Sequence, residues 1–435
     1  MPPSSALPKT RALHLTLPLA GAVLALLAAC AAPPEVRPPS REARVLRVGT
    51  SGDYPPFSTH REGKVSGFDA ALLESYAADR GYRLEWVRFR WPELVADLGA
   101  GRFEVAASGI TIRPERSLVG RYTVPVARNG ALLLLRRPAW APPPGGSPEE
   151  PLALLAALDK PELRVAVNQG GHLERVARAH FRSARIVAIP DNAAVREALA
   201  TGQADAALTN TVEGPRWAEG LTGIERVGPF TRDVVALYVS PSRAELAADL
   251  DTWLLRQEES GALGRLREQY LGPGATGPTA TPVEALLSAT AERLALMPRV
   301  ATAKRLAGQP IEVPTQEARV LEAARAEVHA AAAALGVPAP PDEAITAFFQ
   351  AQMDAAKKLQ LRAATTETPV HSLEGELRPA LARISARLSA LVPRIPGGVD
   401  REATRKKARE ELASTGLEVE DIHRLADALV ELGAR

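Results

Sequence analysis

The chain has 435 residues with 46% hydrophobic and 24% charged content, and its formal net charge at pH 7 is +2. This composition is that of ordinary globular protein, so it excludes a disordered or fibrous chain. The nearly balanced charge, without a block of basic residues, gives no reason to expect nucleic-acid binding. A chain of this length has room for two or three domains, each with its own core.

The amino-terminal residues have the pattern of an export signal at 1–30. Lys9 and Arg11 precede an apolar run, and Cys30 follows it. The run is too short and wrongly flanked for a membrane-spanning helix, but it fits the apolar segment of a secretory signal. Its end, Leu-Ala-Ala-Cys, resembles a bacterial lipobox, which implies lipid on the Cys30 thiol and cleavage before it. An ordinary signal peptide ending near 31 or 32 is the alternative.

Both alternatives place the mature chain outside the cytoplasm, and the lipobox implies attachment to a membrane facing the periplasm. Residues 31–43 are rich in proline and are expected to form a tether. Because Cys30 is the only cysteine, the exported chain is expected to contain no disulfide, so its cores must be stable without one.

Between 44 and 270, short apolar runs alternate with helical patterns. Strands are predicted at 44–50, 82–87, 103–107, 164–167, 185–189, 204–208 and 233–239. Helices are predicted at 68–79, 91–98, 171–181, 193–200, 243–258 and 263–270. This alternation indicates parallel sheet covered by helices, with ligands bound at the carboxyl ends of the strands. The pattern breaks at 138–151 and then begins again, which indicates two α/β lobes around a cleft.

One loop of this domain suits the binding of a carboxylate. Arg116 follows Ser108 and Thr111, and a guanidinium beside hydroxyl groups commonly holds a carboxylate through two hydrogen bonds. A surface arginine at the start of a helix is the alternative.

Two further features lie in loops that face the expected cleft. The turn Asn168-Gln-Gly-Gly171 precedes a helix, whose first backbone amides could hold a second carboxylate. Tyr54 and Trp91 are either core residues or walls for a ring, and their loop positions favour the cleft.

Four segments of this domain resemble a known family: LRVGTSGDYPPF, GFDAALLE, RFEVAASGITIRPER and WLLRQEESGALGRLREQYL. They are similar to the bacterial periplasmic amino-acid-binding proteins and, within that fold, more closely to the exported cyclohexadienyl dehydratases, which act on prephenate or arogenate. The resemblance covers about 46–272 and implies the two-lobe fold. It implies substrate contacts from Asp53, Tyr54, Trp91, Ser108, Thr111, Arg116, Asn168, Gly170, Gly171 and His172.

The resemblance also implies that Glu213 is catalytic, since the dehydratases carry their general acid at the matching position. Prephenate loses its hydroxyl group and carbon dioxide as its ring becomes aromatic, so an acid that protonates the leaving hydroxyl is required. Such a carboxyl needs a pKa raised by an apolar pocket. A solvated helix glutamate is the alternative.

The sequence departs from these families at three places. The amino-acid-binding proteins pair the ligand's ammonium with an aspartate where this chain has Asn210, which favours prephenate over arogenate. The dehydratases usually have Thr-Asn where this chain has His172 and Leu173, and Asp-Gly-Lys where it has residues 129–131. His172 is either a donor to an anion or an exposed residue at a helix start. These differences weaken the expected second carboxylate contact.

The stretch 271–282, LGPGATGPTATP, is expected to be a linker. It holds three glycines and three prolines, and all five Trp and all six Tyr of the chain lie before it. Such a stretch cannot sustain a helix or a central strand. A flexible link of this length spans about 20 Å, and cutting it is expected to yield two separately folded halves.

Residues 283–435 have helical periodicity almost throughout. Helices are predicted at 282–296, 315–335, 342–361, 373–391, 400–412 and 419–432. Asp342 is a candidate N-cap, because it follows two prolines. An all-helical bundle of five or six helices accounts for the pattern, and such bundles are often scaffolds or interaction modules.

Two segments of the bundle, ALLSATAERLALMPRVATAKRLAGQPIE and FFQAQMDAAKKLQ, resemble the exported all-helical chorismate mutases, over about 282–391. By this resemblance Arg293 and Arg378 hold the carboxylates of chorismate. Lys304 and Gln360 donate to its ether oxygen, and Glu317 is retained in the site. The ether oxygen gains negative charge as it breaks, so placed cations and donors are sufficient for catalysis.

The bundle also departs from its family. Where the mutases commonly have Asp-Pro-x-Arg, this chain has Val313-Pro-Thr-Gln316, which removes a carboxylate and an arginine from the expected site. Ala356 replaces a hydroxyl residue that is often found there. Weak, altered or lost mutase activity is therefore an alternative to full activity.

Together the two resemblances predict an exported bifunctional enzyme of phenylalanine biosynthesis. The bundle would convert chorismate to prephenate, and the two-lobe domain would convert prephenate to phenylpyruvate. Neither step needs a cofactor or a metal, and none is expected. A lipid-anchored receptor for an amino-acid-type ABC importer, with a degenerate helical appendage, is the alternative, and sensing of aromatic precursors is a third. No oligomeric state is predicted.

Overall fold

The computed structural model describes residues 44–137, 151–272, 275, 277–363 and 370–434. The predicted signal peptide with its candidate lipidation residue Cys30, the expected tether at 31–43 and nearly all of the break at 138–151 lie outside the described residues. Within the described ranges, no helix is both long and apolar enough to cross a membrane.

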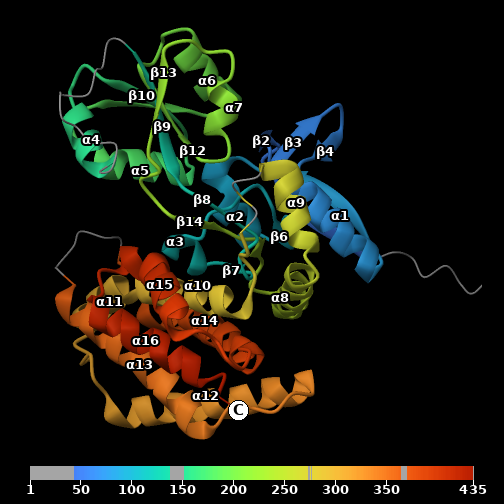
Figure 1. Cartoon of the computed structure of the whole chain (residues 1–435), viewed down its shortest axis with the longest axis vertical. Helices are drawn as coiled ribbons and strands as arrows, with labels where there is room; N and C mark the ends of the chain where they lie inside the picture. Colours follow the sequence, from blue (N-terminus) through green and yellow to red (C-terminus); the bar gives the residue numbers. More distant parts are fainter. Residues whose placement is uncertain (1–43, 138–150, 273–274, 276, 364–369, 435) are drawn as a thin grey trace, which may run out of the picture. The chain divides into compact units, whose positions relative to one another are not determined.

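The first domain has two lobes, each built on a five-stranded sheet (Figure 1). The sheet of the first lobe has the order β5 (Tyr82–Arg88), β1 (Arg44–Thr50), β6 (Val105–Ala106), β15 (Tyr238–Val239) and β7 (Arg121–Tyr122). Strands β5, β1 and β6 are parallel, as predicted, whereas β15 runs antiparallel to β6 and β7. The helices of this lobe are α1 (Phe68–Arg80), α2 (Leu94–Gly99), α8 (Ala244–Glu259) and α9 (Ala262–Leu271).

The sheet of the second lobe has the order β11 (Arg185–Ile189), β10 (Arg164–Asn168), β12 (Ala206–Asn210), β9 (Ala131–Arg136) and β13 (Ile224–Val227). Strands β11, β10 and β12 are parallel, and β9 runs antiparallel to β12 and β13. The helices are α4 (Pro151–Leu158), α5 (His172–His180), α6 (Asn192–Ala200) and α7 (Gly214–Ala218). Residues 131–135 of β9 are all buried, as expected for a central strand covered on both faces. The two-lobe prediction is confirmed.

Two short strands carry the chain between the lobes. Strand β8 (Ala127–Asn129) pairs antiparallel with β14 (Asp233–Val235), which places Asp233 opposite Asn129. The single strand predicted at 233–239 is therefore two strands, one in this crossing ribbon and one in the first sheet. The loop in which Tyr54 was expected differs too, because β2 (Asp53–Tyr54) pairs with β3 (Ser58–Arg61), which pairs with β4 (Lys64–Ser66).

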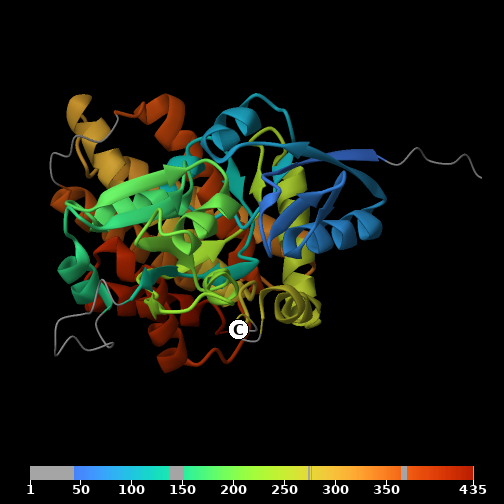
Figure 2. The same ribbon diagram turned by 90° about the horizontal axis from the view of Figure 1, so that it is seen from above.

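The second domain is an all-helical bundle, coloured from yellow to red (Figures 1 and 2). Its helices in the described residues are α10 (Pro282–Ala295), α11 (Met297–Leu306), α12 (Pro314–Leu335), α13 (Asp342–Arg362), α14 (Arg378–Leu391), α15 (Arg401–Leu412) and α16 (Val419–Glu431). The helix that the sequence did not predict is α11. It begins beside Pro298, because proline fits the first turn of a helix but not its interior.

Two local predictions in the bundle differ from the structure. Asp342 is not an N-cap but the first residue of α13, and its Oδ1 lies 2.6 Å from Nε2 of His329. The helix predicted at 373–391 starts as a π-helical turn at Leu373–Leu377 before α14 begins.

The described part of the expected linker is not free. Thr279 and Ala280 are buried, and their backbone N–H groups donate to Oε2 of Glu258 at 3.3 and 3.0 Å. Glu258 forms a buried ion pair with Arg267 at 2.6 Å. The same continuous apolar core contains side chains from both domains, and Ala280 is one of them. Separate folding of two halves after a cut in this stretch stays a prediction.

The crossing strands are also tied to the bundle. Nη1 of Arg128 in β8 lies 2.5 Å from Oε2 of Glu411, and Nη1 of Arg232, which precedes β14, lies 3.1 Å from Oε2 of Glu410. Both glutamates belong to α15. One helix of the bundle therefore holds both segments that connect the lobes.

Candidate active sites

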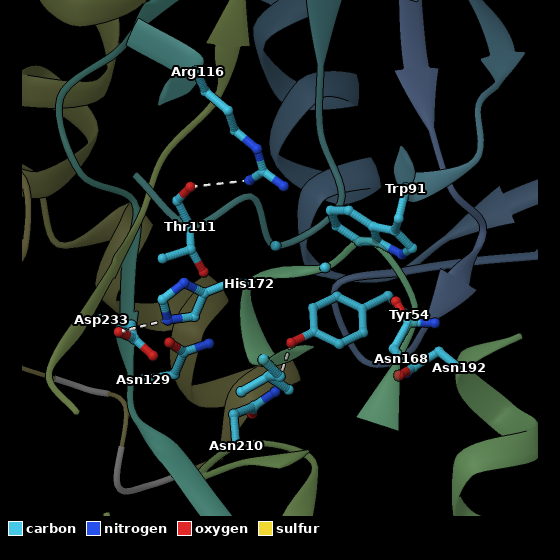
Figure 3. Close-up of a pocket in the computed structure, with 13 residues that line it drawn as sticks. Tyr54, Trp91, Thr111, Arg116, Asn129, Asn168, His172, Asn192, Asn210 and Asp233 are labelled. Atoms are coloured by element: carbon cyan, nitrogen blue, oxygen red, sulfur yellow. Dashed lines mark hydrogen bonds and ion pairs between the residues drawn. The ribbon is translucent and has the colours of Figure 1, made fainter. Parts of the chain in front are cut away.

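The first pocket lies between the two lobes of the first domain (Figure 3). The first lobe, the crossing strands and the second lobe all contribute to its wall. The lining residues are Tyr54, Trp91, Gly109, Thr111, Arg116, Asn129, Asn168, Gly171, His172, Leu173, Asn192, Asn210 and Asp233. The pocket thus brings together seven residues predicted as substrate contacts: Tyr54, Trp91, Thr111, Arg116, Asn168, Gly171 and His172.

Arg116 is placed to receive an anion. It belongs to α3 (Pro114–Ser117), is 3% exposed, and donates from Nη1 to the backbone oxygen of Thr111 at 3.1 Å. Its guanidinium carbon lies 5.9 Å from the centre of the Trp91 ring (Figure 3). Nε1 of Trp91 is buried without a hydrogen-bond partner among the described residues, so it is a further donor to a ligand.

Ser108 does not line the pocket, contrary to the prediction. Its hydroxyl is buried and shares hydrogen bonds with the hydroxyls of Ser58 at 2.7 Å and Thr50 at 3.2 Å, and it accepts from the backbone N–H of Ser51 at 2.9 Å. These bonds join β1 to the loop after β6. The hydroxyl of Ser108 is therefore used in hydrogen bonds within the fold next to the pocket.

The amino terminus of α5 is less open to an anion than predicted. The N–H of Gly170 donates at 2.7 Å to Oε2 of Glu174, which lies in the first turn of the helix, and Gly170 is not in the pocket wall. Gly171 and Asn168 do line the pocket, and Nδ2 of Asn168 is 3.4 Å from each of two backbone oxygens, those of Ile189 and Pro190. A carboxylate of the chain itself thus occupies part of this site.

His172 lines the pocket and is paired with a residue that the sequence reasoning missed. Its Nε2 lies 3.0 Å from Oδ1 of Asp233 in β14 (Figure 3), but neither ring nitrogen has a hydrogen-bond partner among the described residues. His172 is therefore not the freely exposed helix-start residue of the alternative. Asp233 and Asn129 escaped notice because the sequence did not reveal the crossing strands.

Glu213 lies buried directly behind the pocket wall, at the end of β12. Its Oε1 accepts from Nδ2 of Asn192 at 2.8 Å. Its Oε2 accepts from Oγ1 of Thr209 and from Nδ2 of Asn210, both at 3.1 Å. Burial, together with a smaller effect of the nearby charge of Asp53, raises the pKa of Glu213 to about 8 against the lowering effect of these hydrogen bonds. The side chain is fully buried, so the solvated alternative is wrong.

Two asparagines separate Glu213 from the cavity. Asn192 and Asn210 both line the pocket, and Asn210 also donates from Nδ2 to the Tyr54 hydroxyl at 2.6 Å. Asp53, a predicted contact, accepts from the backbone N–H of Asn192 at 3.4 Å and does not line the pocket. Direct proton transfer from Glu213 to a ligand thus requires its carboxyl to turn toward the cavity. Asn192 follows strand β11, so the rule of strand carboxyl ends could have found it.

The second pocket lies inside the bundle. Its wall includes all five predicted residues, each from a different helix of α10 to α14: Arg293, Lys304, Glu317, Gln360 and Arg378. The departures from the mutase pattern, Val313, Gln316 and Ala356, line the same pocket, so they alter the site itself.

Arg293 and Gln360 carry free polar atoms in this pocket. Nη1 of Arg293 and Oε1 of Gln360 are buried without hydrogen-bond partners among the described residues. Burial lowers the pKa of Arg293 to about 10. Unpaired buried donors are costly, and a dianionic ligand would pair with the arginine.

The other two cations already have partners. Nζ of Lys304 donates to the backbone oxygen of Ile311 at 2.9 Å, and burial, together with the charge of Arg378, lowers the pKa of Lys304. Nη1 of Arg378 lies 2.6 Å from Oε1 of Glu374 on a partly exposed edge. Glu317 pairs at 3.2 Å with Lys357, a pocket residue that the sequence reasoning missed.

Comparison with known proteins supports both domains. Residues 46–273 match the family of bacterial extracellular solute-binding proteins, family 3, and residues 284–361 match chorismate mutase type II. A cyclohexadienyl dehydratase of Pseudomonas aeruginosa is 33% identical over 234 residues, which are 53% of this chain and 84% of that protein. A probable amino-acid ABC transporter-binding protein of Haemophilus influenzae is 32% identical over 96 residues, 22% of this chain and 37% of that one.

Among solved structures, an ancestral amino-acid-binding protein described as a precursor of cyclohexadienyl dehydratase is 27% identical, with a TM-score of 0.47. It covers 52% of this chain and 95% of its own. The family match covers more than half of this chain, and the dehydratase relative is matched over most of its length. The chain therefore belongs to the family 3 bacterial extracellular solute-binding proteins and carries, in addition, a region of the chorismate mutase type II family.

Proposed function

We propose that the chain is a bifunctional enzyme that converts chorismate to prephenate in its bundle and prephenate to phenylpyruvate in its two-lobe domain. The observation that carries the proposal is the buried Glu213, with a raised pKa, behind a pocket that also presents Arg116. A receptor for a carboxylated solute needs the arginine but has no use for a buried acid behind the pocket wall. The dehydratase relative supports the same choice.

The proposed dehydratase step uses Glu213 as a general acid. Its proton passes to the ring hydroxyl of prephenate, which leaves as water. The ring carboxylate leaves as carbon dioxide, and its bonding electrons complete the aromatic ring. Arg116 holds a carboxylate of the substrate, and the free Nε1 of Trp91 is a second donor.

Prephenate is favoured over arogenate, because the pocket offers no unpaired carboxylate for an ammonium group among the described residues. Asn210 stands where the amino-acid-binding proteins have an aspartate, and the carboxylate of Asp233 is paired with His172.

The proposed mutase step needs only charge placed in a dry pocket. Arg293 and Arg378 would hold the two carboxylates of chorismate, while Lys304 and Gln360 donate to the breaking ether oxygen. Gln360 has its Nε2 near the backbone oxygen of Ala356 at 3.3 Å, so this donor must turn to serve the ligand.

Export follows from membership of an extracellular family, and we propose in addition that Cys30 carries a lipid that holds the chain to a membrane facing the periplasm. Metabolic labelling with a fatty acid, compared between the natural chain and Cys30→Ser, tests this proposal. Equal labelling of both would contradict it.

The decisive test of the function is direct turnover. The purified chain, mixed with prephenate, should produce the absorbance of phenylpyruvate, and with chorismate it should consume that substrate. Tight binding of prephenate without product would favour the receptor instead. An inactive bundle beside an active dehydratase would leave the helical domain as an appendage.

We expect dehydratase kcat to fall as the pH rises through about 8. Glu213 acts in its protonated form, and its pKa is raised from the usual 4.5 to about 8 by burial. The free energy of unfolding should change with pH in the same direction. A raised pKa means that the folded state holds the Glu213 proton more tightly than the unfolded state does, so this contribution to stability is present at low pH and is lost as the pH approaches 8. Above that value kcat should drop about tenfold per pH unit. A profile that rises from pH 6 to 9 would contradict the assignment.

A further inference from the structure

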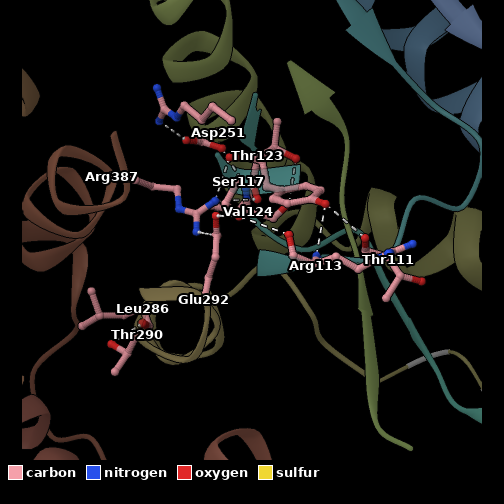
Figure 4. Close-up of polar contacts among 12 residues, drawn as sticks. Thr111, Arg113, Ser117, Thr123, Val124, Asp251, Leu286, Thr290, Glu292 and Arg387 are labelled. Atoms are coloured by element: carbon pink, nitrogen blue, oxygen red, sulfur yellow. Dashed lines mark hydrogen bonds and ion pairs between the residues drawn. The ribbon is translucent and has the colours of Figure 1, made fainter. Parts of the chain in front are cut away.

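The helix that carries Arg116 is a single turn. Helix α3 spans only Pro114–Ser117, and a helix of one turn is not stable by itself in water. Its conformation must therefore be set by what packs against it, and much of that comes from the helical bundle (Figure 4).

Three side chains of the bundle hold this turn directly. Oγ of Ser117 donates to Oε1 of Glu292 in α10 at 2.7 Å. Nη2 of Arg383 in α14 donates to the backbone oxygens of Ser117 and Leu118, both at 3.0 Å. At the other end of the turn, Nη2 of Arg299 in α11 lies 2.5 Å from Oε1 of Glu115.

Glu292 is itself fixed by a buried ion pair. Its Oε2 is bonded to Nη2 of Arg387, and both side chains are almost fully buried. Nη1 of Arg387 reaches into the first domain and donates to the backbone oxygen of Tyr122 at 2.7 Å. A buried ion pair is often no more stabilising than apolar packing, so its presence is better explained by the position that it enforces.

The contact joins the neighbours of two ligand-binding arginines. Ser117 follows Arg116, which lines the first pocket, and Glu292 precedes Arg293, which lines the second. We propose that Glu292 and Arg387 are positioning residues for the dehydratase: they fix Ser117 and thereby aim the Arg116 guanidinium at the substrate carboxylate. The bundle then completes the first active site without lining it. This inference rests on the proposed dehydratase function.

The test compares Ser117→Ala with Ser117→Thr in the full chain. The alanine variant loses the hydroxyl that bonds Glu292, so Arg116 is less well aimed and KM for prephenate should rise about tenfold. Because Arg116 holds the carboxylate in both the ground and transition states, kcat should change much less. Threonine keeps the hydroxyl and should restore most of the affinity, which a loss of packing alone would not explain.

Two further variants make the outcome decisive. Arg299→Gln removes the bundle's partner of Glu115 at the other end of the turn, where Arg175 of the first domain remains paired with Glu115. It should also raise KM, even if Ser117→Ala fails to fold. Arg116→Lys reports on the proposed function itself. If the natural chain turns over prephenate and Arg116→Lys raises KM, but Ser117→Ala and Arg299→Gln leave KM unchanged, the positioning role is wrong. If the natural chain has no turnover at all, the proposed function fails instead.

Discussion

Glu213→Gln is expected to lower kcat for prephenate dehydration by about 10²- to 10⁴-fold, the usual contribution of a general acid. The amide has nearly the same shape as the carboxyl but cannot give up a proton to the leaving hydroxyl. Glu213 accepts hydrogen bonds from the amide nitrogens of Asn192 and Asn210, which can only donate, and from Thr209, whose hydroxyl can also accept. The protonated carboxyl therefore has an acceptor for its hydrogen at rest and can release it when the substrate is bound.

The matched control for this variant is Glu219→Gln. Glu219 follows α7, the helix that begins directly after Glu213, but it is exposed and away from the pocket. The same chemical change there should leave kcat within about twofold, as is typical of surface substitutions. KM should change little in either variant, because Arg116 still holds the carboxylate. Full activity of Glu213→Gln would remove the general acid from the proposal and reopen the receptor alternative.

Arg293→Ala is expected to lower kcat/KM for chorismate by about 10²- to 10³-fold, the loss typical for one donor that stabilises developing charge. The buried Nη1 of Arg293 has no partner among the described residues, so the ligand is its natural partner. Burial lowers the pKa of this guanidinium, which means that the fold bears a cost for keeping it charged. The variant should therefore lose activity without a lower unfolding temperature.

The control for the mutase is Arg319→Ala on α12. Arg319 is exposed and does not line the second pocket, and its replacement by alanine removes the same charge. The kcat/KM of the Arg319→Ala variant for chorismate should stay near that of the natural chain. The outcome that counts against a mutase is equal chorismate consumption by both variants, or none by the natural chain.

Local pattern was enough to predict most elements. Strand β1 at Arg44–Thr50 and strand β11 at Arg185–Ile189 have the predicted bounds, because each is a short apolar run with polar residues beyond it. Strand β9 at Ala131–Arg136 was not predicted. Strand β15 lies within the strand predicted at 233–239, but its antiparallel direction could not be predicted, since direction depends on partners that are distant in the sequence. The linker looked free for a related reason: glycine and proline exclude regular structure, but they do not prevent Thr279 and Ala280 from being buried.

The same difference between local pattern and distant partners applies to the residues of the two sites. Residues with a chemical signature in a motif, such as Arg116 and Glu213, were predicted. The motif also assigned Ser108 to the ligand, although its hydroxyl is used within the fold. Asp233, by contrast, has no motif, and only the crossing of β8 and β14 brings it to His172. A contact between domains, such as that of Ser117 with Glu292, cannot be predicted from the sequence, because neither residue stands out until the structure places both.

The ion pairs that join Arg128 and Arg232 to Glu411 and Glu410 bear on how the lobes can move. In a receptor the lobes swing about the crossing strands, and that swing is what a transport partner detects. Here each crossing segment is tied to the same helix, and the carboxylate of Glu411 is largely buried. A wide swing would have to break these ties. A hinge restricted in this way keeps the groups of the two lobes in a fixed arrangement. That arrangement suits an enzyme, which needs the same active-site geometry at every turnover, better than a receptor, which must open to release its solute.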